Sequence, residues 1–262
     1  MSESLGQWRS APLVYVLAEV RCSPTLDVAK RASAVQEAIR GEFPLLEPVA
    51  EVRFGAGVPA GSTASTMFAF TDSSKRRGVV VTSTSLCYHV TEYVTSAEFF
   101  EELGRLLKLL EPIYAADAVT RMGLRYVDAI IPSANMSISD YISPNMVGVS
   151  LGGGEQRRVQ CVVEEARPNG GIAVRLLALG LPIYLSPDLL ALGLRRPSWV
   201  DAANERQAPA AILDTDNWVA AERIFEAQEI LATFKGLKEG ITDAFLRSIT
   251  DHSKKEWQLP RE

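Results

Sequence analysis

Two arginines on one predicted β-strand are the leading candidates for a binding surface. Arg121 and Arg125 lie in the strand expected over residues 120–131, with Gly123 between them. Side chains alternate along a strand, so both arginines project from the same face. The missing side chain at Gly123 leaves room for a planar guanidinium or a bound phosphate. We therefore predict that these arginines, with the adjacent Tyr126, bind a ligand or a partner.

The alternative for these arginines is a structural ion network. The tetrapeptide Ala-Glu-Val-Arg occurs twice, ending at Arg21 and at Arg53. In each strand the Glu and the Arg share one face, so neighbouring strands would form a cross-strand charge ladder with Glu19 and Glu51. Otherwise Arg21 and Arg53 extend a polar face that recognises an anionic ligand or a partner. Replacing Arg121 and Arg125 by alanine separates the two: loss of binding with an intact fold favours a binding face, and unfolding favours the network.

Two predicted turns are basic. One contains Lys75, Arg76 and Arg77, and the other contains Arg157 and Arg158 after a glycine-rich stretch. Such turns are usually solvated hairpin tips, but they can also form a rim that contacts phosphates. The glycine-rich stretch lacks the GxxxxGK[ST] spacing of a P-loop. These turns leave an RNA-binding or RNA-processing protein as an alternative function.

Groups that could support catalysis are few. Asp214 and Asp216 alternate on a predicted strand and could hold a magnesium ion, although such residues more often end a strand or cap a helix. His89 with Glu92 could form an acid–base couple, but no nucleophile accompanies it. We therefore predict no catalytic residue, no metal ligand and no cofactor. An aspartate-based, metal-dependent enzyme is kept as a third alternative.

Composition narrows the class of protein. The chain has 262 residues, 47% of them apolar and 23% charged, with a net charge of −5 and a mean hydropathy of +0.05. This excludes a disordered chain and argues against broad nucleic-acid binding. Three cysteines and two histidines are too few for a disulfide framework or a zinc centre. The N-terminus does not read as a signal peptide, and the longest apolar run, 176–185, is too short to span a bilayer. We expect a cytoplasmic protein with reduced thiols and no membrane contact.

The elements that position these residues predict an α+β fold with antiparallel sheets covered by long helices. In the first half we expect strands over 13–22, 49–54, 66–72, 79–90 and 120–131, and helices over 26–41 and from Ser96 to about Pro112. In the second half we expect strands over 146–151, 158–165, 172–179 and 211–214. A single helix is expected over 220–254, with more apolar residues than one narrow stripe. Its extra apolar face could be shared in a dimer or with a partner.

The two halves resemble each other at an offset of 125 residues. Residues 89–94 lead into a helix containing Phe100-Glu101, and residues 214–219 lead into one containing Phe225-Glu226. The match is either coincidence between strand-to-helix units or a duplication that fused two related α+β halves. We divide the chain into an N-terminal half over 1–131, a connecting segment over 132–145 and a C-terminal half over 146–262.

Several segments together resemble a sporadically distributed family of bacterial proteins of unknown function. They are PLVYVLAEVRCSP (12–24), QEAIRGEFP (36–44), RMGLRYVDAI (121–130), ILDTDNW (212–218), FEAQEIL (225–231) and ITDAFLRSIT (241–250). The resemblance extends over most of the chain. It implies no activity, cofactor or catalytic residue; the patchy distribution implies an accessory role, for example in mobile elements or anti-phage defence loci.

The predicted function is a cytoplasmic, non-enzymatic binding protein. It would act as an adaptor or regulatory component through contacts with a protein partner or with itself. The reasons are the scarcity of catalytic residue types, the arginine-bearing strand face and the strongly apolar C-terminal helix.

Overall fold

The computed structural model describes residues 11–47, 50–52, 65–133, 135–149, 152, 158–179, 185–206 and 208–258. The strands in these ranges are β1 (Leu13–Cys22), β2 (Leu45–Leu46), β3 (Ala50–Val52), β4 (Ser65–Thr71), β5 (Arg77–Val81), β6 (Ser85–Val90), β7 (Ala118–Ile130), β8 (Arg158–Arg167), β9 (Gly170–Leu179) and β10 (Ala210–Ile224). They form one sheet in the order β2-β4-β5-β6-β1-β7-β10-β9-β8, with β3 paired to β4 beside this path. Every pairing is antiparallel. The predicted α+β class with an antiparallel sheet is confirmed.

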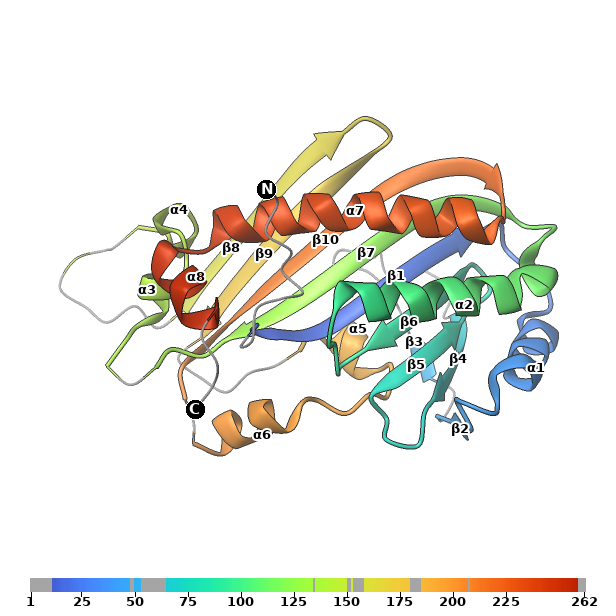
Figure 1. Ribbon diagram of the computed structural model, residues 1–262, viewed down its shortest axis with the longest axis horizontal. Coiled ribbons are helices and arrows are strands. Elements are labelled where there is room, and N and C mark those ends of the chain that lie inside the picture. The colour runs from blue at the N-terminus through green and yellow to red at the C-terminus, as the bar shows by residue number, and fades with distance from the viewer. Residues whose placement is uncertain are drawn as a thin grey trace.

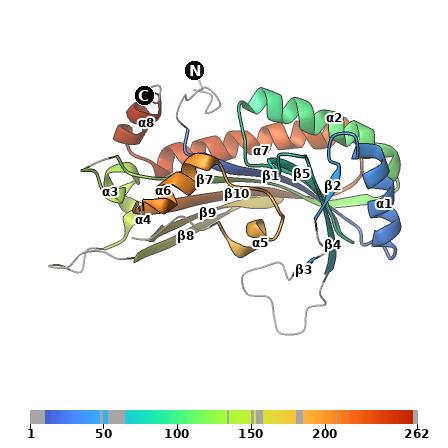
Figure 2. The same cartoon turned by 90° about the horizontal axis from the view of Figure 1, so that it is seen from below.

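The helices in the described ranges are α1 (Val28–Ile39), α2 (Ser96–Tyr114), α3 (Ile138–Tyr141), α4 (Pro144–Val147), α5 (Pro187–Leu190), α6 (Ser198–Glu205), α7 (Ala227–Ser248) and α8 (Asp251–Gln258). The two long helices α2 and α7 run side by side over one face of the sheet (Figure 1). Figure 2 shows α5 below the opposite face. We call the face under α2 and α7 the helix face and the other the open face. None of the helices in the described ranges is long and apolar enough to cross a membrane.

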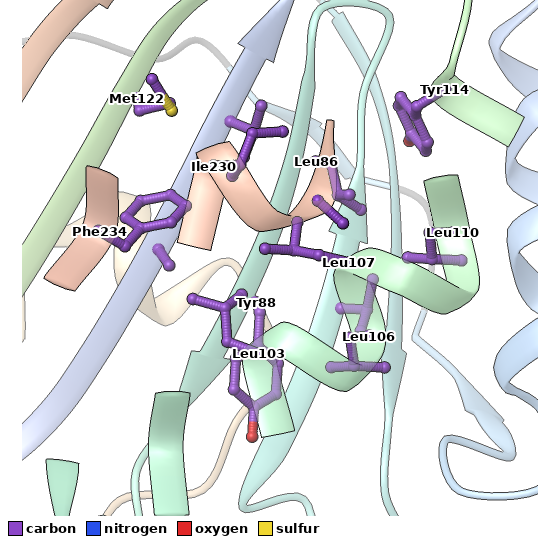
Figure 3. Packing of buried hydrophobic residues seen from close by; sticks show 14 of the residues in the cluster. Leu86, Tyr88, Leu103, Leu106, Leu107, Leu110, Tyr114, Met122, Ile230 and Phe234 are labelled. Atoms are coloured by element: carbon purple, nitrogen blue, oxygen red, sulfur yellow. The ribbon is translucent and has the colours of Figure 1, made fainter. Parts of the chain in front are cut away.

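The main core lies between the helix face and its helices. Even-numbered residues of β1, such as Val16, Ala18 and Val20, point into it because side chains alternate along the strand. α2 contributes a stripe of leucines and phenylalanines at helical spacing, which meets Ile230 and Phe234 of α7 (Figure 3). Burial of this apolar surface is the main force that holds the helices on the sheet.

α2 begins and ends close to the predicted positions. Its N-cap is Thr95, whose hydroxyl accepts a hydrogen bond from the Glu98 N–H at 3.2 Å, so the cap precedes the predicted Ser96 by one residue. Pro112 lies inside the last turn, and the helix continues to Tyr114.

Four predicted elements are wrong in type or extent. The strand predicted over 79–90 is two strands, β5 and β6, separated by a turn. Part of the strand predicted over 146–151 is the short helix α4, and residues 150 and 151 lie outside the described ranges. The strand predicted over 211–214 is part of a much longer strand, β10, which extends to Ile224. The helix predicted over 220–254 begins only after this strand and consists of two separate helices, α7 and α8.

The length of β10 has a tertiary cause. It pairs with β7 on one side and β9 on the other, so its backbone groups find partners over almost all of its length. Beyond Val219 only β7 is paired, and this pairing, which reaches Ile224, keeps residues 220–224 in the strand although the apolar spacing of the segment predicted a helix from residue 220.

Residues related by the 125-residue offset do not lie in equivalent elements. Tyr93 lies in the loop after β6, whereas Trp218 lies inside β10. Phe100 lies inside α2, whereas Phe225 precedes α7. The order of elements does repeat. In the first half, β1 pairs with β6, which is the last of the three strands β4, β5 and β6 that precede α2. In the second half, β7 pairs with β10, which is the last of the three strands β8, β9 and β10 that precede α7.

The wide apolar surface predicted for the C-terminal helix is divided between two contacts within the chain. Ile230 and Phe234 of α7 are fully buried in the core, and Leu231 packs against α2 beside Gly104. Phe225 is buried before the helix begins, and only Ile224, at the end of β10, is largely exposed.

Candidate functional site

The open face carries charged residues at the centre of the sheet. The registers of β1, β7 and β10 place Glu19 opposite Gly123, and Gly123 opposite Trp218. The next row on the same face contains Arg125 between β1 and Asp216 of β10. Strand alternation, as predicted, puts Arg121 and Arg125 on this one face.

A cleft opens over these rows. It encloses about 640 Å³ of empty space, part of it open to solvent. Five strands form its floor and α5 forms one wall. We call it the central cleft; its lining residues are Leu17, Glu19, Arg21, Val80, Thr82, Ser85, Cys87, Arg121, Gly123, Arg125, Asp188, Leu189, Leu192 and Asp216.

Arg121 occupies the space that Gly123 leaves. A Cβ at Gly123 would lie 2.7 Å from Nη1 of Arg121, so the guanidinium lies directly over the glycine. Nη1 donates to Oε2 of Glu19 at 2.8 Å, and Nη2 lies 3.4 Å from Oδ2 of Asp216. The guanidinium carbon is 5.5 Å from the centre of the Trp218 ring, within reach of a cation–π interaction. The space predicted above Gly123 is therefore filled by the guanidinium of Arg121 from the same chain.

Arg125 is held from two directions. Its Nε and Nη2 donate to the two carboxylate oxygens of Asp214 at 2.8 and 2.6 Å, a bidentate pair. Its Nη1 donates to Asp188 at 2.6 Å and its Nη2 to the Ser186 hydroxyl at 3.0 Å. Asp188 lies on α5, so this arginine fastens the wall of the cleft to the sheet.

The charges of the cleft balance. Its lining contains three arginines and three carboxylates. Burial raises the pKa of Asp216, against the opposing effect of Arg121. Burial opposes ionisation of Asp188 too, but Arg125 and Ser186 together hold the pKa of that carboxyl below its usual value. The site is therefore a neutral, mixed-charge surface and not an excess of positive charge.

Arg21 is the most accessible arginine of the group. Its Nε donates to Oε2 of Glu19 at 2.9 Å, the same oxygen that accepts from Arg121, and its side chain is 48% exposed. The predicted ladder between the two Ala-Glu-Val-Arg segments is wrong, because β1 pairs with β6 and β7 while β3 pairs with β4. Glu19 meets Arg121 instead. Arg53 lies outside the described residues.

Tyr126 does not belong to the cleft. Strand alternation places it on the helix face, where it is buried in the main core with its hydroxyl 3.2 Å from that of Tyr93. Because Arg125 and Tyr126 are adjacent in one strand, their side chains point to opposite faces. The adjacency of Arg125 and Tyr126 in the sequence was therefore enough to predict that Tyr126 lies on the opposite face.

The basic turn at residues 75–77 is not a solvated tip, because each side chain has a partner. Lys75 Nζ lies 2.6 Å from Glu47, and Arg77 Nη1 donates to Glu102 at 2.6 Å. Arg76 donates to the backbone carbonyl of Arg195 at 3.2 Å and to that of Arg196. The turn is thus docked on the segment after α5.

The second basic turn lies far from the first. Arg157 is outside the described residues, and Arg158 begins β8, where it is exposed. Five strands separate β5 from β8 in the sheet order. The structure does not bring Lys75, Arg76 and Arg77 together with Arg158 into one basic surface.

The candidates for acid–base and metal chemistry are already engaged. Asp214 and Asp216 do share a face, but Arg125 and Arg121 occupy the positions that a cation would take. Among the described residues, no three His, Cys, Asp or Glu side chains gather to hold a metal ion. His89 is buried, whereas Glu92 is exposed in the following loop.

His89 and Tyr15 form a buried pair on the open face of the sheet. The Tyr15 hydroxyl lies 2.5 Å from Nδ1, and Nε2 has no hydrogen-bond partner in the described structure. Gly78 on β5 makes space for this ring, since a Cβ there would lie 2.5 Å from Nε2. Burial lowers the pKa of His89 to about 3.

We expect His89 to make stability fall as the pH falls. The unfolded chain protonates its histidine near the ordinary pKa of 6.5, while the folded chain keeps this ring neutral down to about pH 3. Unfolding therefore takes up a proton in this window, and His89 contributes a slope of up to about 1.4 kcal/mol per pH unit. Urea unfolding of wild type and His89→Gln between pH 7 and about pH 5 measures this slope.

The second histidine is the matched control. His252 is 42% exposed on α8, where it lies 3.1 Å from Glu256. His89→Gln should give a flatter slope than His252→Gln, because only the first replacement removes the buried ring. Equal slopes for wild type and His89→Gln would contradict a neutral buried imidazole.

Sequence reasoning missed the residues that complete the site. Ser186 and Asp188 come from a segment more than 60 residues after Arg125 in the sequence. Their own signal was weak: Ser-Pro-Asp is typical of a helix start, which says nothing about an arginine partner. Trp218 was recognised only as part of the repeat and not as the aromatic neighbour of Arg121.

No protein-family model matches this chain, and no curated protein matches it significantly. The resemblance to a sporadically distributed bacterial family therefore stays a prediction.

Proposed function

We propose that this chain is a non-enzymatic binding protein, an adaptor or regulatory component, that holds a segment of a protein partner in the central cleft. The observation that carries the proposal is the balanced charge of an open cleft whose polar groups are already fixed by the fold. Three arginines and three carboxylates line it beside Leu17, Leu189 and Leu192. Such a mixture of fixed polar groups and apolar side chains is typical of protein interfaces, in which arginine is enriched.

The pairing inside the cleft favours recognition over catalysis. Arg121 and Arg125 donate to carboxylates on β1, β10 and α5, so their orientations are set before a partner arrives. Pre-organised groups lose little entropy on binding. Arg21, which is half exposed, remains at the rim, where a partner's polar groups can reach it.

The same geometry disfavours the RNA alternative. Binding to a phosphate backbone depends on Lys and Arg that neutralise phosphates, whereas Lys75 and Arg77 are already paired with Glu47 and Glu102. Arg158 is at the far end of the sheet. Nothing in the described residues favours the aspartate-based enzyme, because both aspartates are held by arginines.

The experiment is affinity purification of the full chain from its native host, with the proteins retained quantified by mass spectrometry. We expect Arg21→Glu to reduce retention of the partner about tenfold, because it places a carboxylate beside Glu19 at the rim of the cleft. The thermal midpoints of the variant and the wild type should be similar, since the side chain is half exposed.

Arg40→Glu is the matched control. Arg40 is 67% exposed after the last turn of α1, away from the cleft, so the same charge reversal there should leave the partner bound. Equal retention by wild type and Arg21→Glu contradicts the proposal. Loss of all bound material after nuclease treatment supports the RNA alternative.

We also propose that the chain arose by duplication of one α+β unit. The repeated order of elements supports this: a strand, a three-strand run whose last member pairs with that first strand, and a long helix. On this reading the repeat boundary falls between α2 and β7, and β1 and β7 meet at the centre of the sheet. The boundary at 132–145 inferred from composition would then lie inside the second unit.

We propose a cytoplasmic location for this protein. Cys22, Cys87 and Cys161 are all free thiols in the structure. The bacterial family that the sequence resembles implies an accessory role in a mobile element or defence locus. The identity of the neighbouring genes tests that role directly, because a partner of an accessory protein is often encoded beside it.

A further inference from the structure

One edge of the sheet is long and open. β8 hydrogen-bonds to β9 along one side, and no strand of the described residues lies along its other side (Figure 1). The opposite end of the sheet is different, because β2 and β3 have only two and three residues. Natural sheets protect their edges with short strands, lysine, proline or bulges. β8 has 10 residues, contains neither Lys nor Pro, and pairs with β9 without a register shift.

Apolar side chains are exposed on both faces of this edge. Val162 is 54% exposed and Val163 is 45% exposed. They are adjacent in the strand and so point to opposite faces. An edge strand with no neighbouring strand among the described residues and with exposed valines is a template for another strand.

We propose that β8 pairs antiparallel with β8 of a second copy of this chain, so that two sheets join into one. In a symmetric pair the two-fold axis is perpendicular to the sheet. Residues that lie opposite each other must point to the same face, so the axis passes midway between one residue and its own copy, and the register is centred on that residue. Registers centred on Cys161, Val162, Val163 or Glu164 keep most of the strand paired. The register centred on Glu164 sets this carboxylate opposite its own copy, which is destabilising, so three registers remain.

Charge selects the register centred on Cys161. It places Arg158 opposite Glu164 of the second copy, and by symmetry the same pair forms twice. It also places Val159 opposite Val163 of the second copy. Opposite charges and β-branched residues directly across an antiparallel pair are both stabilising.

The other two registers lack this complementarity. Centred on Val162, the pairing puts Arg158 opposite Ala166 of the second copy. Centred on Val163, it puts Val162 opposite Glu164 of the second copy. Both leave the exposed charges of Arg158 and Glu164 without opposite partners.

Charge reversal tests the register. We expect the wild-type chain to be a dimer by sedimentation equilibrium. Arg158→Glu and Glu164→Arg should each raise the dissociation constant about tenfold, because two attractive pairs become repulsive. The double variant Arg158→Glu with Glu164→Arg should restore the wild-type constant. A monomeric wild type overturns the proposal, and so do single charge reversals that leave the dissociation constant unchanged. If the single variants dissociate and the double variant does not restore the wild-type constant, the register centred on Cys161 is wrong.

Thiol cross-linking is an independent readout. The register brings the two Cys161 side chains directly opposite each other, while Cys22 and Cys87 are buried within each chain. A short bismaleimide should therefore give a covalent dimer of the wild type that is lost in Cys161→Ser. The cross-link should weaken in Arg158→Glu and return in the double variant. A cross-link that persists in Cys161→Ser contradicts pairing through β8.

Discussion

Replacing Arg125 by methionine is expected to lower the free energy of unfolding by about 3–5 kcal/mol, measured by urea unfolding at neutral pH. Arg125 donates to Asp214 through two bonds and to Asp188 through a third, and its side chain is only 17% exposed. Without the guanidinium, two carboxylates remain close together in a poorly solvated site. Binding through the cleft should weaken as well, because α5 loses its tie to the sheet.

Two further variants make this result specific. Adding Asp188→Asn and Asp214→Asn to Arg125→Met removes the uncompensated charges and should recover much of the lost stability. Arg21→Met removes a half-exposed arginine from the same face and should cost no more than about 0.5 kcal/mol. An Arg125→Met protein as stable as wild type would show that the network is not structural, which would return Arg125 to the role of a free binding residue.

Replacing Gly170 by alanine is expected to cost about 3 kcal/mol, the upper end for overpacking. Gly170 opens β9 opposite Val219 of β10, and a Cβ there would lie 2.0 Å from the backbone oxygen of Trp218. A backbone atom cannot move aside as a flexible side chain can, so the two strands must separate locally. Thermal and urea unfolding measure the loss, and hydrogen exchange should show opening at the β9–β10 pair.

Gly236 provides the matched control for this substitution. It lies within α7, and a Cβ there would meet no atom within 4 Å. Gly236→Ala should therefore stabilise the protein by about 0.5–1 kcal/mol through helix propensity. If Gly170→Ala were as harmless as Gly236→Ala, the close approach of β9 to β10 would be contradicted.

Much of the local structure was predictable. The bounds expected for β1 are those observed, because the segment is rich in strand-forming residues and Pro24 follows it. α2 was recognised from its apolar spacing and from the polar residues at its start. The full length of β10 was not recognised, since its Ala-Ala-Glu-Arg segment has helix propensity, and only pairing with β7 extends the strand through it.

The candidate site was predictable in part. Strand parity placed Arg121, Gly123 and Arg125 on one face, and the same parity should have excluded Tyr126. The ladder between Glu19 and Glu51 failed because both Ala-Glu-Val-Arg segments read as strands, and periodicity does not say which strands are neighbours. Asp188 was out of reach for the same reason: no local pattern connects it to Arg125.

The sequence by itself determined which residues form most of the strands and helices and which side chains share a strand face. These properties follow from alternation, propensity and capping over a few residues. Only the tertiary structure decided that the arginines are neutralised, that they build a cleft, and that β8 is left as an open edge. Those outcomes depend on which strands pair and where α5 docks. Such long-range contacts gain their stability from apolar burial and backbone pairing over the whole sheet, and no short segment encodes that choice.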